Sequence, residues 1–530
     1  MTAAPTATEA TRPDFASQLH PVGPTAHRGE IPRWVVVSLG LVVIAGTFLR
    51  FFARSPLWLD ETLSVNIATV PLGELRGALE RDGAPPLYYL ILHGWTKVFG
   101  TGDTAVRSLS GVFSAATLPL FWFAGRRVGG RSGAIAALTL GATSPYAIRF
   151  GVETRMYSLV ALLVFAAWLL LANLLERPRA HWFAGVAIVS GLLVLTHYWS
   201  FYLLAATVVM LGYRWRRGRG TEPRHALIAI GAIATGGILF VPWLRTFLYQ
   251  TANTGTPWGA PATPIDVVIT TVLDFGGGRG PLGRILSICL ASLILLGIFG
   301  RALDARRIEL DLRTRPESRH ELIVAGATLM LAVLAGYVSG SAFASRYASV
   351  VFPFAILIAA IGTKAIADRR IAGTLLVVCA LCGLGASASD AVKPRTQAQQ
   401  VANAIAAAGG QPGDVVVYCP DQVAPDVNRV LPDGYREMTF PDKADPRFVN
   451  WVGYAARMKA VDPEQFAGEI LELAPDATIW HVWTSGYRTL GKRCERINDA
   501  LAAARPAAKT LLDASPRIFE KHNLTRHPVS

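Results

Sequence analysis

Charged residues are scarce in this chain. Asp, Glu, Lys and Arg make up 17% of its 530 residues, against about 25% in a soluble globular domain. The shortage is confined to residues 33–389, which form a series of apolar runs, whereas residues 390–530 have the composition of a soluble domain. We therefore predict two units, a polytopic membrane domain and a C-terminal globular domain of about 140 residues, long enough to bury its own core.

Acidic residues are also fewer than basic ones, 37 against 51, which leaves a formal net charge of +14. Residues 390–530 contribute nothing to this excess, because they hold 17 residues of each kind. The surplus cations lie in the short loops between apolar runs, where they indicate membrane topology and not nucleic-acid binding. We expect no nucleic-acid partner.

The chain lacks the motifs of several enzyme classes. It has no H-E-x-x-H pair, no paired-cysteine zinc spacing and no serine-hydrolase elbow. The glycine-rich run at 275–283 lacks the Gly-Lys-Ser/Thr ending of a phosphate loop, so we interpret it as a flexible outer loop. We therefore expect no cofactor and no required metal, although carboxylates beside a phosphate could recruit an ion.

Cysteine is rare, with five residues. Cys289, Cys379 and Cys382 fall within apolar runs, where a free thiol packs like a small hydrophobic side chain. We prefer this interpretation to a redox or metal-binding C-x-x-C. Cys419 and Cys494 both lie in the C-terminal domain, and they are able to form a disulfide if that domain is extracytoplasmic. The sequence alone leaves that question open.

Eleven apolar runs are predicted to cross the bilayer, which takes about 20 residues. The first, from about Trp34 to Ala53, has no cleavage site after it and is predicted to be a signal anchor behind a disordered cytoplasmic tail, residues 1–32. Residues 85–99 are short and amphipathic, so we interpret them as a helix lying at the membrane interface. The other predicted spans are at 104–125, 132–150, 156–175, 182–197, 198–213, 226–248, 281–300, 322–341, 347–367 and 371–389.

The charges of the loops decide the orientation. With a cytoplasmic N-terminus, the inner loops hold 19 Lys and Arg in about 55 residues, and the outer loops hold 8 in about 98. This asymmetry follows the positive-inside rule, whereas counting 85–99 as a span would place the arginine-rich loops outside. We predict a mainly α-helical, multi-pass protein of the cell membrane, with interfacial helices in the outer loop 54–103 and an extracytoplasmic C-terminal domain.

The C-terminal domain, residues 390–530, has an α/β pattern, in which apolar β-branched runs alternate with helical ones. The loops that follow the strands are where an open α/β sheet usually binds ligands, an expectation that rests on the fold class alone. We predict strands at 414–419 and 478–483, helices at 396–408, 463–473 and 488–504, and ligand-binding loops at 420–422 and 484–487.

Polar residues gather at the predicted outer ends of the spans. The first outer loop carries an adjacent acidic pair, Asp60 and Glu61, which is costly beside a membrane unless it has a use or water reaches it. If the outer ends meet in the bundle, acids, arginines and a histidine share one cavity at the outer leaflet. The other candidates are Arg54, Asp82, Glu153, Arg155, His197, Tyr198, Arg346 and Tyr347.

Acids and arginines together suit sugar transfer from a lipid phosphate. A sugar hydroxyl has a pKa far above physiological pH, so transfer to it benefits from a positioned carboxylate as general base. Arginine holds a departing phosphate through two hydrogen bonds and stays charged in a partly dry site. Because no nucleotide sugar is present outside the membrane, an energised donor must arrive there as a lipid.

Four motifs follow one another in the chain: L-W-L-D-E-T-L-S, D-G-A-P-P-L-Y-Y-L-I-L-H-G-W, V-E-T-R-M-Y-S-L and S-R-Y-A-S-V-V-F-P. Together they resemble the family of integral-membrane glycosyltransferases with the GT-C fold, over roughly residues 34–370. The branch they resemble most is the protein O-mannosyltransferase and aminoarabinose transferase group, glycosyltransferase family 39. The resemblance implies a polyprenyl-phosphate-sugar donor, with mannose ahead of arabinose, and an inverting one-step transfer to a cell-envelope glycan, lipid or protein.

Carried over residue by residue, the resemblance makes Asp60 the catalytic base and Glu61 its neighbour in the site. Many members of the family have a histidine before the two prolines, where this chain has Ala84, so an acceptor role of that histidine is in doubt here. The resemblance and the loop positions assign the donor phosphate to Arg155, Arg346 and Tyr347, and the lining of the cavity to Glu153, Tyr157, His197 and Asp82.

Simpler explanations exist for these residues. Asp60 is suited to cap a helix that begins at Glu61. Arg346 fits an arginine that snorkels at the membrane boundary, and Glu153 with Arg155 fits a solvated pair. His197 fits a packed interfacial histidine, and Arg54 and Asp82 fit solvated residues.

Two other functions compete with sugar transfer. A transporter or flippase for lipid-linked sugars predicts charges at mid-membrane and two matching halves of the chain, and the sequence shows neither. A non-catalytic assembly protein would work through its C-terminal domain and would tolerate the loss of Asp60.

Overall fold

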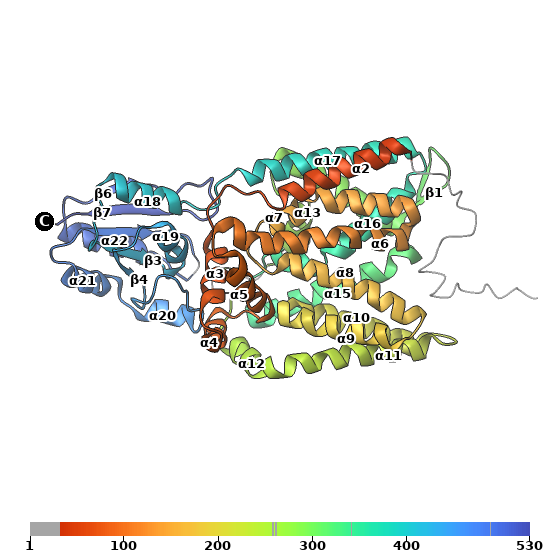
Figure 1. Cartoon of the computed structure of the whole chain (residues 1–530), viewed down its shortest axis with the longest axis horizontal. Coiled ribbons are helices and arrows are strands. Elements are labelled where there is room, and N and C mark those ends of the chain that lie inside the picture. Colours follow the sequence, from red (N-terminus) through yellow and green to blue (C-terminus); the bar gives the residue numbers. More distant parts are fainter. Residues whose placement is uncertain (1–31, 257–258, 260–261, 341, 488, 530) are drawn as a thin grey trace, which may run out of the picture.

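The computed structural model of the chain describes residues 32–256, 259, 262–340, 342–487 and 489–529. It has two parts, a long helical bundle and a small α/β domain at one end of it (Figure 1). Between them lie three helices of the predicted outer loop, α3 (Leu59–Thr69), α4 (Leu72–Asp82) and α5 (Leu87–Phe99). The predicted tail lies outside the described residues except for its last position.

Helices occupy every predicted span. Within the described ranges, six helical segments are long and apolar enough to cross a membrane, so the count of eleven spans stays a prediction. The bundle contains α2 (Arg33–Leu49), α6 (Asp103–Thr143), α7 (Pro145–Gly151), α8 (Tyr157–Glu176), α9 (Ala180–Thr196), α10 (Trp199–Arg217), α11 (Glu222–Gly236), η1 (Gly237–Trp243), α12 (Leu244–Asn253), α13 (Pro264–Phe275), α14 (Pro281–Phe299), α15 (Pro316–Ser339), η2 (Ser345–Val350), α16 (Phe352–Gly362), η3 (Thr363–Ala365) and α17 (Arg369–Ala391).

The bundle departs from the predicted boundaries in two places. The element α6 consists of two helices that meet at Gly130, whose φ of 64° and ψ of −149° are not helical, so the break predicted between 125 and 132 is present. The predicted span 132–150 is the second of these helices followed by α7, because the chain turns at Ser144, whose hydroxyl accepts a hydrogen bond from the Ala147 amide. Part of the predicted loop 249–280 is helical. Thr263 begins α13 with a capping box, in which its side chain and that of Asp266 satisfy each other's backbone amides.

Two glycines let α14 and α16 pack closely. A Cβ at Gly362 would lie 1.9 Å from the carbonyl oxygen of Leu293, and one at Gly297 would lie 2.1 Å from that of Ile358. Small residues at such crossings let helix backbones approach, which increases the van der Waals packing that helps to drive helix association in lipid.

Arg50 closes the end of α2, just before the segment that leads to α3. Its side chain is fully buried, and its guanidinium donates to the carbonyl oxygens of Gly46, Gly141 and Ala142, each at 2.7 Å. It also donates to the Ser114 hydroxyl at 2.9 Å. A cation is favourable at helix C-termini, where carbonyl groups lack partners, so Arg50 fixes the point from which the outer loop starts.

The C-terminal domain is built on a five-stranded sheet in the order β4-β3-β5-β7-β6. The central pairs β4–β3 and β3–β5 are parallel, whereas β7 runs antiparallel to its neighbours. The elements are α18 (Ala398–Ala407), β3 (Val415–Cys419), η4 (Asp421–Val423), α19 (Ala424–Val430), β4 (Arg436–Thr439), α20 (Tyr454–Ala460), α21 (Pro463–Leu473), β5 (Ile479–Trp483), α22 (Arg493–Ala504), β6 (Lys509–Leu512) and β7 (Asn523–His527).

The two predicted strands are therefore confirmed as β3 and β5, and three further strands were not predicted. Strand β3 is buried on both faces, which explains its unbroken apolar run. One face of this sheet, with side chains from β3 and β5, belongs to an apolar cluster that also contains Trp58, Leu59 and Leu63 of the outer loop. The C-terminal domain and α3 thus share one core.

A disulfide joins Cys419 at the end of β3 to Cys494 in α22, which answers the question that the sequence left open. Cys289, Cys379 and Cys382 are free thiols, and the last two are buried in the bundle as the packing interpretation requires. A hairpin of β1 (Gly300–Ala302) and β2 (Ile308–Leu310), in a predicted inner loop, lies at the bundle end opposite to the α/β domain (Figure 1).

Asp421 makes the stability of the C-terminal domain depend on pH. Its buried carboxylate accepts a hydrogen bond of 2.7 Å from the Tyr454 hydroxyl, and burial raises its pKa to about 7. An unfolded aspartate has a pKa of about 3.9, so the folded state binds the proton more tightly, and the stability of the protonated form is lost as the pH rises through about 7.

We therefore expect the melting temperature of the domain to fall between pH 5 and pH 8, and to fall less in Asp421→Asn, which stays neutral. Thermal unfolding of the purified protein at both pH values, followed by circular dichroism, measures the difference. The exposed Asp433→Asn is the control and should behave like the wild type. Equal pH slopes for wild type and Asp421→Asn would contradict the assignment.

Candidate active site

The first turn of α3 presents Asp60. The helix begins at Leu59 after an extended Trp58, so Asp60 lies inside the helix and does not cap it. The Asp60 carboxylate Oδ2 lies 3.3 Å from Nη1 of Arg346, and only 14% of its side chain is exposed. The backbone carbonyl of Asp60 accepts a hydrogen bond from the Ser64 hydroxyl at 2.8 Å. The acid therefore faces a cation that lies almost 300 residues further along the chain.

Arg155, on the turn between α7 and α8, lies on the same side of α3. Its Nη1 donates to the Asp60 backbone carbonyl at 3.3 Å, the Ser64 hydroxyl at 3.1 Å and the Tyr89 hydroxyl at 3.3 Å. Tyr89 in turn donates to Oδ2 of Asp82 at 3.0 Å. Burial raises the pKa of Asp82, although the charge of Arg155 opposes the shift. Tyr89 thus links Asp82 to Arg155 through hydrogen bonds.

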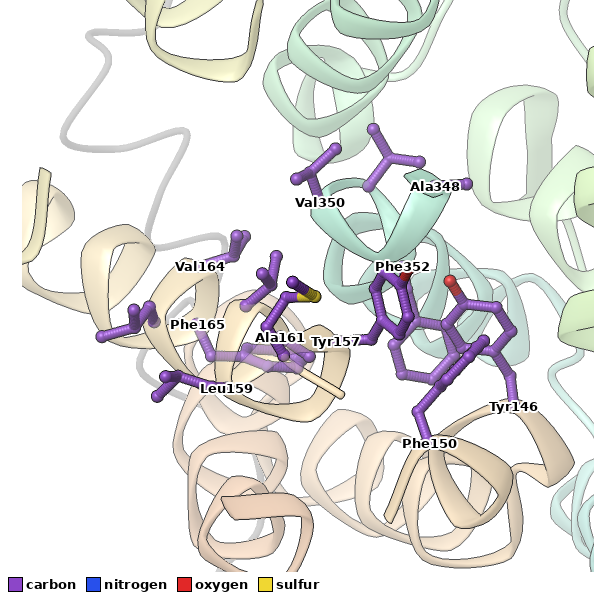
Figure 2. Close-up of a cluster of buried hydrophobic side chains, with 14 of the residues drawn as sticks. Tyr146, Phe150, Tyr157, Leu159, Ala161, Val164, Phe165, Ala348, Val350 and Phe352 are labelled. Atoms are coloured by element: carbon purple, nitrogen blue, oxygen red, sulfur yellow. The ribbon is translucent and has the colours of Figure 1, made fainter. Parts of the chain in front are cut away.

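An aromatic cluster holds the backbone that carries Arg346. The hydroxyl of Tyr146 donates to the carbonyl oxygens of Ser345 at 3.1 Å and Arg346 at 3.3 Å. The Tyr146 ring packs on Phe150 and Phe352, with centroids 4.6 and 5.0 Å away, and Figure 2 shows the three rings together. These contacts therefore hold the backbone from which the Arg346 guanidinium extends.

These groups open into one cavity of about 320 Å³. Two acids and two arginines lie on its wall, so the charges nearly balance before any ligand binds. Ala84, at the position where the resembled family has a histidine, also lines it and leaves space there. The residues that line the cavity include Asp60, Asp82, Ala84, Arg155, Tyr157, His197, Tyr198, Trp199, Arg346, Tyr347 and Trp451.

Aromatic rings form a further part of the cavity wall. The His197 ring lies 5.8 Å from Tyr157 and 5.6 Å from Tyr347, and Trp199 lies 5.5 Å from Tyr347. Nδ1 of His197 accepts a hydrogen bond from the Trp199 amide at 3.2 Å. His197 is thus both a packed residue and a lining residue, so the two readings of the sequence do not exclude each other.

Two predicted acids do not line the cavity. Glu61 is fully buried, and Arg107 donates to its two oxygens at 2.8 and 2.6 Å, while the Thr154 amide donates to it at 3.0 Å. Glu153 accepts a hydrogen bond of 2.7 Å from Arg395. From these positions, Glu61 and Glu153 can affect the cavity only by holding the chain next to Arg155.

Several site residues were not predicted. Tyr89 and Ser64 lie within the motifs that drew attention, but both side chains are uncharged at neutral pH, so neither stood out beside the acids and arginines. Trp451 comes from the C-terminal domain, where its amide donates to the Arg81 carbonyl at 2.9 Å. No local sequence pattern predicts that Trp451 lines the cavity, because the docking of the C-terminal domain brings it there. Arg54 does not line the cavity.

Comparison with known proteins gives the same overall architecture. ArnT from Cupriavidus metallidurans, bound to undecaprenyl phosphate, aligns over 94% of this chain and 99% of its own, with 12% identity and a TM-score of 0.59. Its apo form gives a TM-score of 0.57 at 13% identity. The arabinofuranosyltransferase AftD from Mycobacteria aligns with 95% of this chain and 42% of its own length, with 13% identity and a TM-score of 0.48.

Residues 83–245 match the family described as dolichyl-phosphate-mannose-protein mannosyltransferase. No curated protein matches the chain. The apolar helices and the full-length alignment with ArnT establish the class: this is a multi-pass membrane protein with the GT-C fold of integral-membrane glycosyltransferases, as the sequence predicted. Within that class, the matched segment is similar to protein O-mannosyltransferases.

Proposed function

We propose that the protein transfers a sugar from a polyprenyl-phosphate donor to an acceptor outside the cytoplasm, with Asp60 as general base. The observation that carries the proposal is the convergence of Asp60, Arg155 and Arg346, from three distant segments, on one cavity. A base and two phosphate-holding cations are the groups that this reaction needs. ArnT, whose fold this chain shares, binds undecaprenyl phosphate, which supports a polyprenyl donor.

The reaction is a single displacement at the anomeric carbon of the sugar. The acceptor oxygen forms a bond to that carbon while the bond from the carbon to the phosphate oxygen breaks, and Asp60 takes the acceptor proton. The polyprenyl phosphate leaves with the bonding electrons, and the guanidinium groups of Arg155 and Arg346 stabilise its added negative charge. No nucleotide takes part.

Such a displacement inverts the anomeric centre, so the base and the phosphate must lie on opposite faces of the sugar ring. In the structure, Oδ2 of Asp60 and Nη1 of Arg346 are 3.3 Å apart, too close to hold a sugar ring between them. Donor binding therefore has to separate the pair. The phosphate is suited to do so, because it offers Arg346 a second anion and frees the Asp60 carboxylate for the acceptor.

The cavity lies at the end of the bundle next to the C-terminal domain, and we propose that this end is extracytoplasmic. The loop charges favour this orientation. The Cys419–Cys494 disulfide supports it, because disulfides persist in oxidising compartments. For the sugar we propose mannose first, in line with the family matched by residues 83–245, and arabinose second. The acceptor is a cell-envelope glycan, lipid or protein.

A panel of donors tests the proposal. Purified protein in detergent or vesicles is incubated with radiolabelled polyprenyl-phosphate mannose, arabinose and aminoarabinose, and with GDP-mannose, in the presence of an envelope extract as acceptor. We expect one polyprenyl-phosphate sugar to be consumed and the nucleotide sugar to be left intact. Consumption of none of the lipid donors, with transfer of intact lipid across the vesicle bilayer, would support a flippase instead.

A further inference from the structure

A buried polar cluster lies in the C-terminal domain, where it faces α3. It consists of Asp426 in α19 and of Glu520 and His522 just before β7. Asp426 and His522 are completely buried and Glu520 is 5% exposed. One possible ligand atom of each residue lies within 4.8 Å of the others. The cluster is separate from the cavity described above.

One distance between ligand atoms of the cluster matches that of a zinc site, and the others are no longer than 4.8 Å. His522 Nε2 lies 3.1 Å from Oδ2 of Asp426 and 3.3 Å from the hydroxyl of Thr396, which also contacts Asp426. Ligands that bind one zinc ion at about 2.0–2.2 Å are themselves about 3–3.5 Å apart. Imidazole nitrogen and carboxylate oxygen are both ligands that zinc accepts.

The burial of two carboxyl groups side by side, Asp426 and Glu520, also favours a bound cation or proton. In the part of the chain that the structure describes, the one ion pair found for either carboxylate is that of Asp426 with His522. Both oxygens of Glu520 lie near the Leu59 amide, at 3.0 and 3.3 Å. Two ionised carboxylates buried side by side are strongly unfavourable without a bound proton or cation.

We infer that Asp426, Glu520 and His522 bind a divalent metal ion, zinc by their ligand types, and that this ion ties the C-terminal domain to the first turn of α3. The tie is short. Glu520 accepts from the amide of Leu59, the residue before Asp60, and the neighbouring Phe519 ring packs edge-on against Trp58 at 5.3 Å. The ion has a structural role, since it does not reach the cavity.

The metal content of the full-length protein tests this directly. The protein is purified in detergent without chelator, incubated with excess zinc and then desalted. We expect inductively coupled plasma mass spectrometry to find about one zinc ion per chain. Treatment with EDTA should remove the ion and lower the melting temperature by about 5 °C, because a ligand at a hundred times its Kd adds about 2.7 kcal/mol to stability. Added zinc should restore it; manganese and calcium serve as comparison ions.

Glu520→Gln separates a metal from a shared proton. Glutamine mimics a protonated glutamate, so the variant keeps wild-type stability if a proton holds the two acids together. If a metal does, the variant loses the ion and no longer responds to EDTA. Glu437→Gln is the matched control: Glu437 is a partly buried carboxylate of the same sheet, hydrogen-bonded to Tyr418 and Asn428 and outside the cluster, and this variant should keep the ion.

Two results would overturn the inference: wild-type protein without stoichiometric metal after zinc exposure, or a Glu520→Gln variant with unchanged metal content. Neither measurement uses sugar transfer. A failure of the proposed function would therefore leave this inference standing, and the reverse is also true.

Discussion

Replacing Asp60 by asparagine is expected to reduce the rate of sugar transfer by a factor of about 10²–10⁴, the usual contribution of a general base. Asparagine keeps the size of the side chain and its place in the first turn of α3, but it cannot accept the acceptor proton. It also ends the ion pair with Arg346. Initial rates with the preferred polyprenyl-phosphate sugar, measured in vesicles at equal protein amounts, give the factor.

Binding of the donor should survive in this variant, because Arg155 and Arg346 remain. Photo-crosslinking of a polyprenyl-phosphate probe, competed by unlabelled lipid, checks this point. Asp390→Asn is the control, since Asp390 is exposed at the end of α17 and pairs with the exposed Lys393. Near-normal transfer by Asp60→Asn would remove Asp60 as the base, while loss of probe binding would show that its role is in holding the donor site together.

The buried pair of Glu61 and Arg107 should dominate the stability of the outer loop. Arg107 is 7% exposed and donates two hydrogen bonds to the carboxylate, and two more to the backbone carbonyls of Ser55 and Pro56. Breaking a buried ion pair by removing one partner costs about 3–5 kcal/mol, because the other charge is left uncompensated. We expect Arg107→Met to lower the thermal unfolding midpoint strongly.

A double-mutant cycle shows whether the loss arises from the unpaired charge. Adding Glu61→Gln to Arg107→Met should recover part of the lost stability, since neither position then carries an uncompensated charge. Arg307→Met breaks an exposed pair with Asp304 and should cost no more than about 1 kcal/mol. If Arg107→Met behaves like this control, or if the double variant is less stable than Arg107→Met, the pair is not what holds the loop.

The same experiments clarify the part of Glu61 in the site. The sequence motif pairs it with Asp60, yet adjacent residues on a helix point about 100° apart. In the structure one of the two acids therefore faces the cavity and the other faces α6. A sequence motif marks both as significant, but it does not tell a group that meets the substrate from a group that positions the chain.

Much of the bundle was predictable because lipid restricts what a chain can do. Every backbone polar group in the hydrocarbon layer needs an internal partner, so an apolar run there forms a helix. That rule located the helices of the predicted spans. The helix expected from the short amphipathic sequence at 85–99 is present as α5, and its place at the membrane interface stays a prediction. The misplaced boundaries, at Ser144 and at α13, are caps and turns, where a few polar contacts and not hydrophobicity decide the end of a helix.

The C-terminal domain was less predictable, for the opposite reason. Strands β4 and β7 carry Arg-Glu-Met-Thr and Asn-Leu-Thr-Arg-His, which have no clear apolar alternation. They are strands because β3 and β5 offer them backbone partners along their edges. The contribution of Trp451 to the cavity has the same origin, since it depends on the domain docking against α4.

By itself, the sequence determined much about the class of this protein. Its apolar runs and loop cations predicted a multi-pass membrane protein, four of its motifs resembled the GT-C glycosyltransferases, and its acids and arginines pointed to the end of the bundle that carries the cavity. Only the tertiary structure decided which of those groups meet. Periodicity and charge act over a few residues, whereas the contact of Asp60 with Arg346 and the cluster of Asp426, Glu520 and His522 join segments tens to hundreds of residues apart. Such contacts form when packed helices and a docked domain bring their ends together.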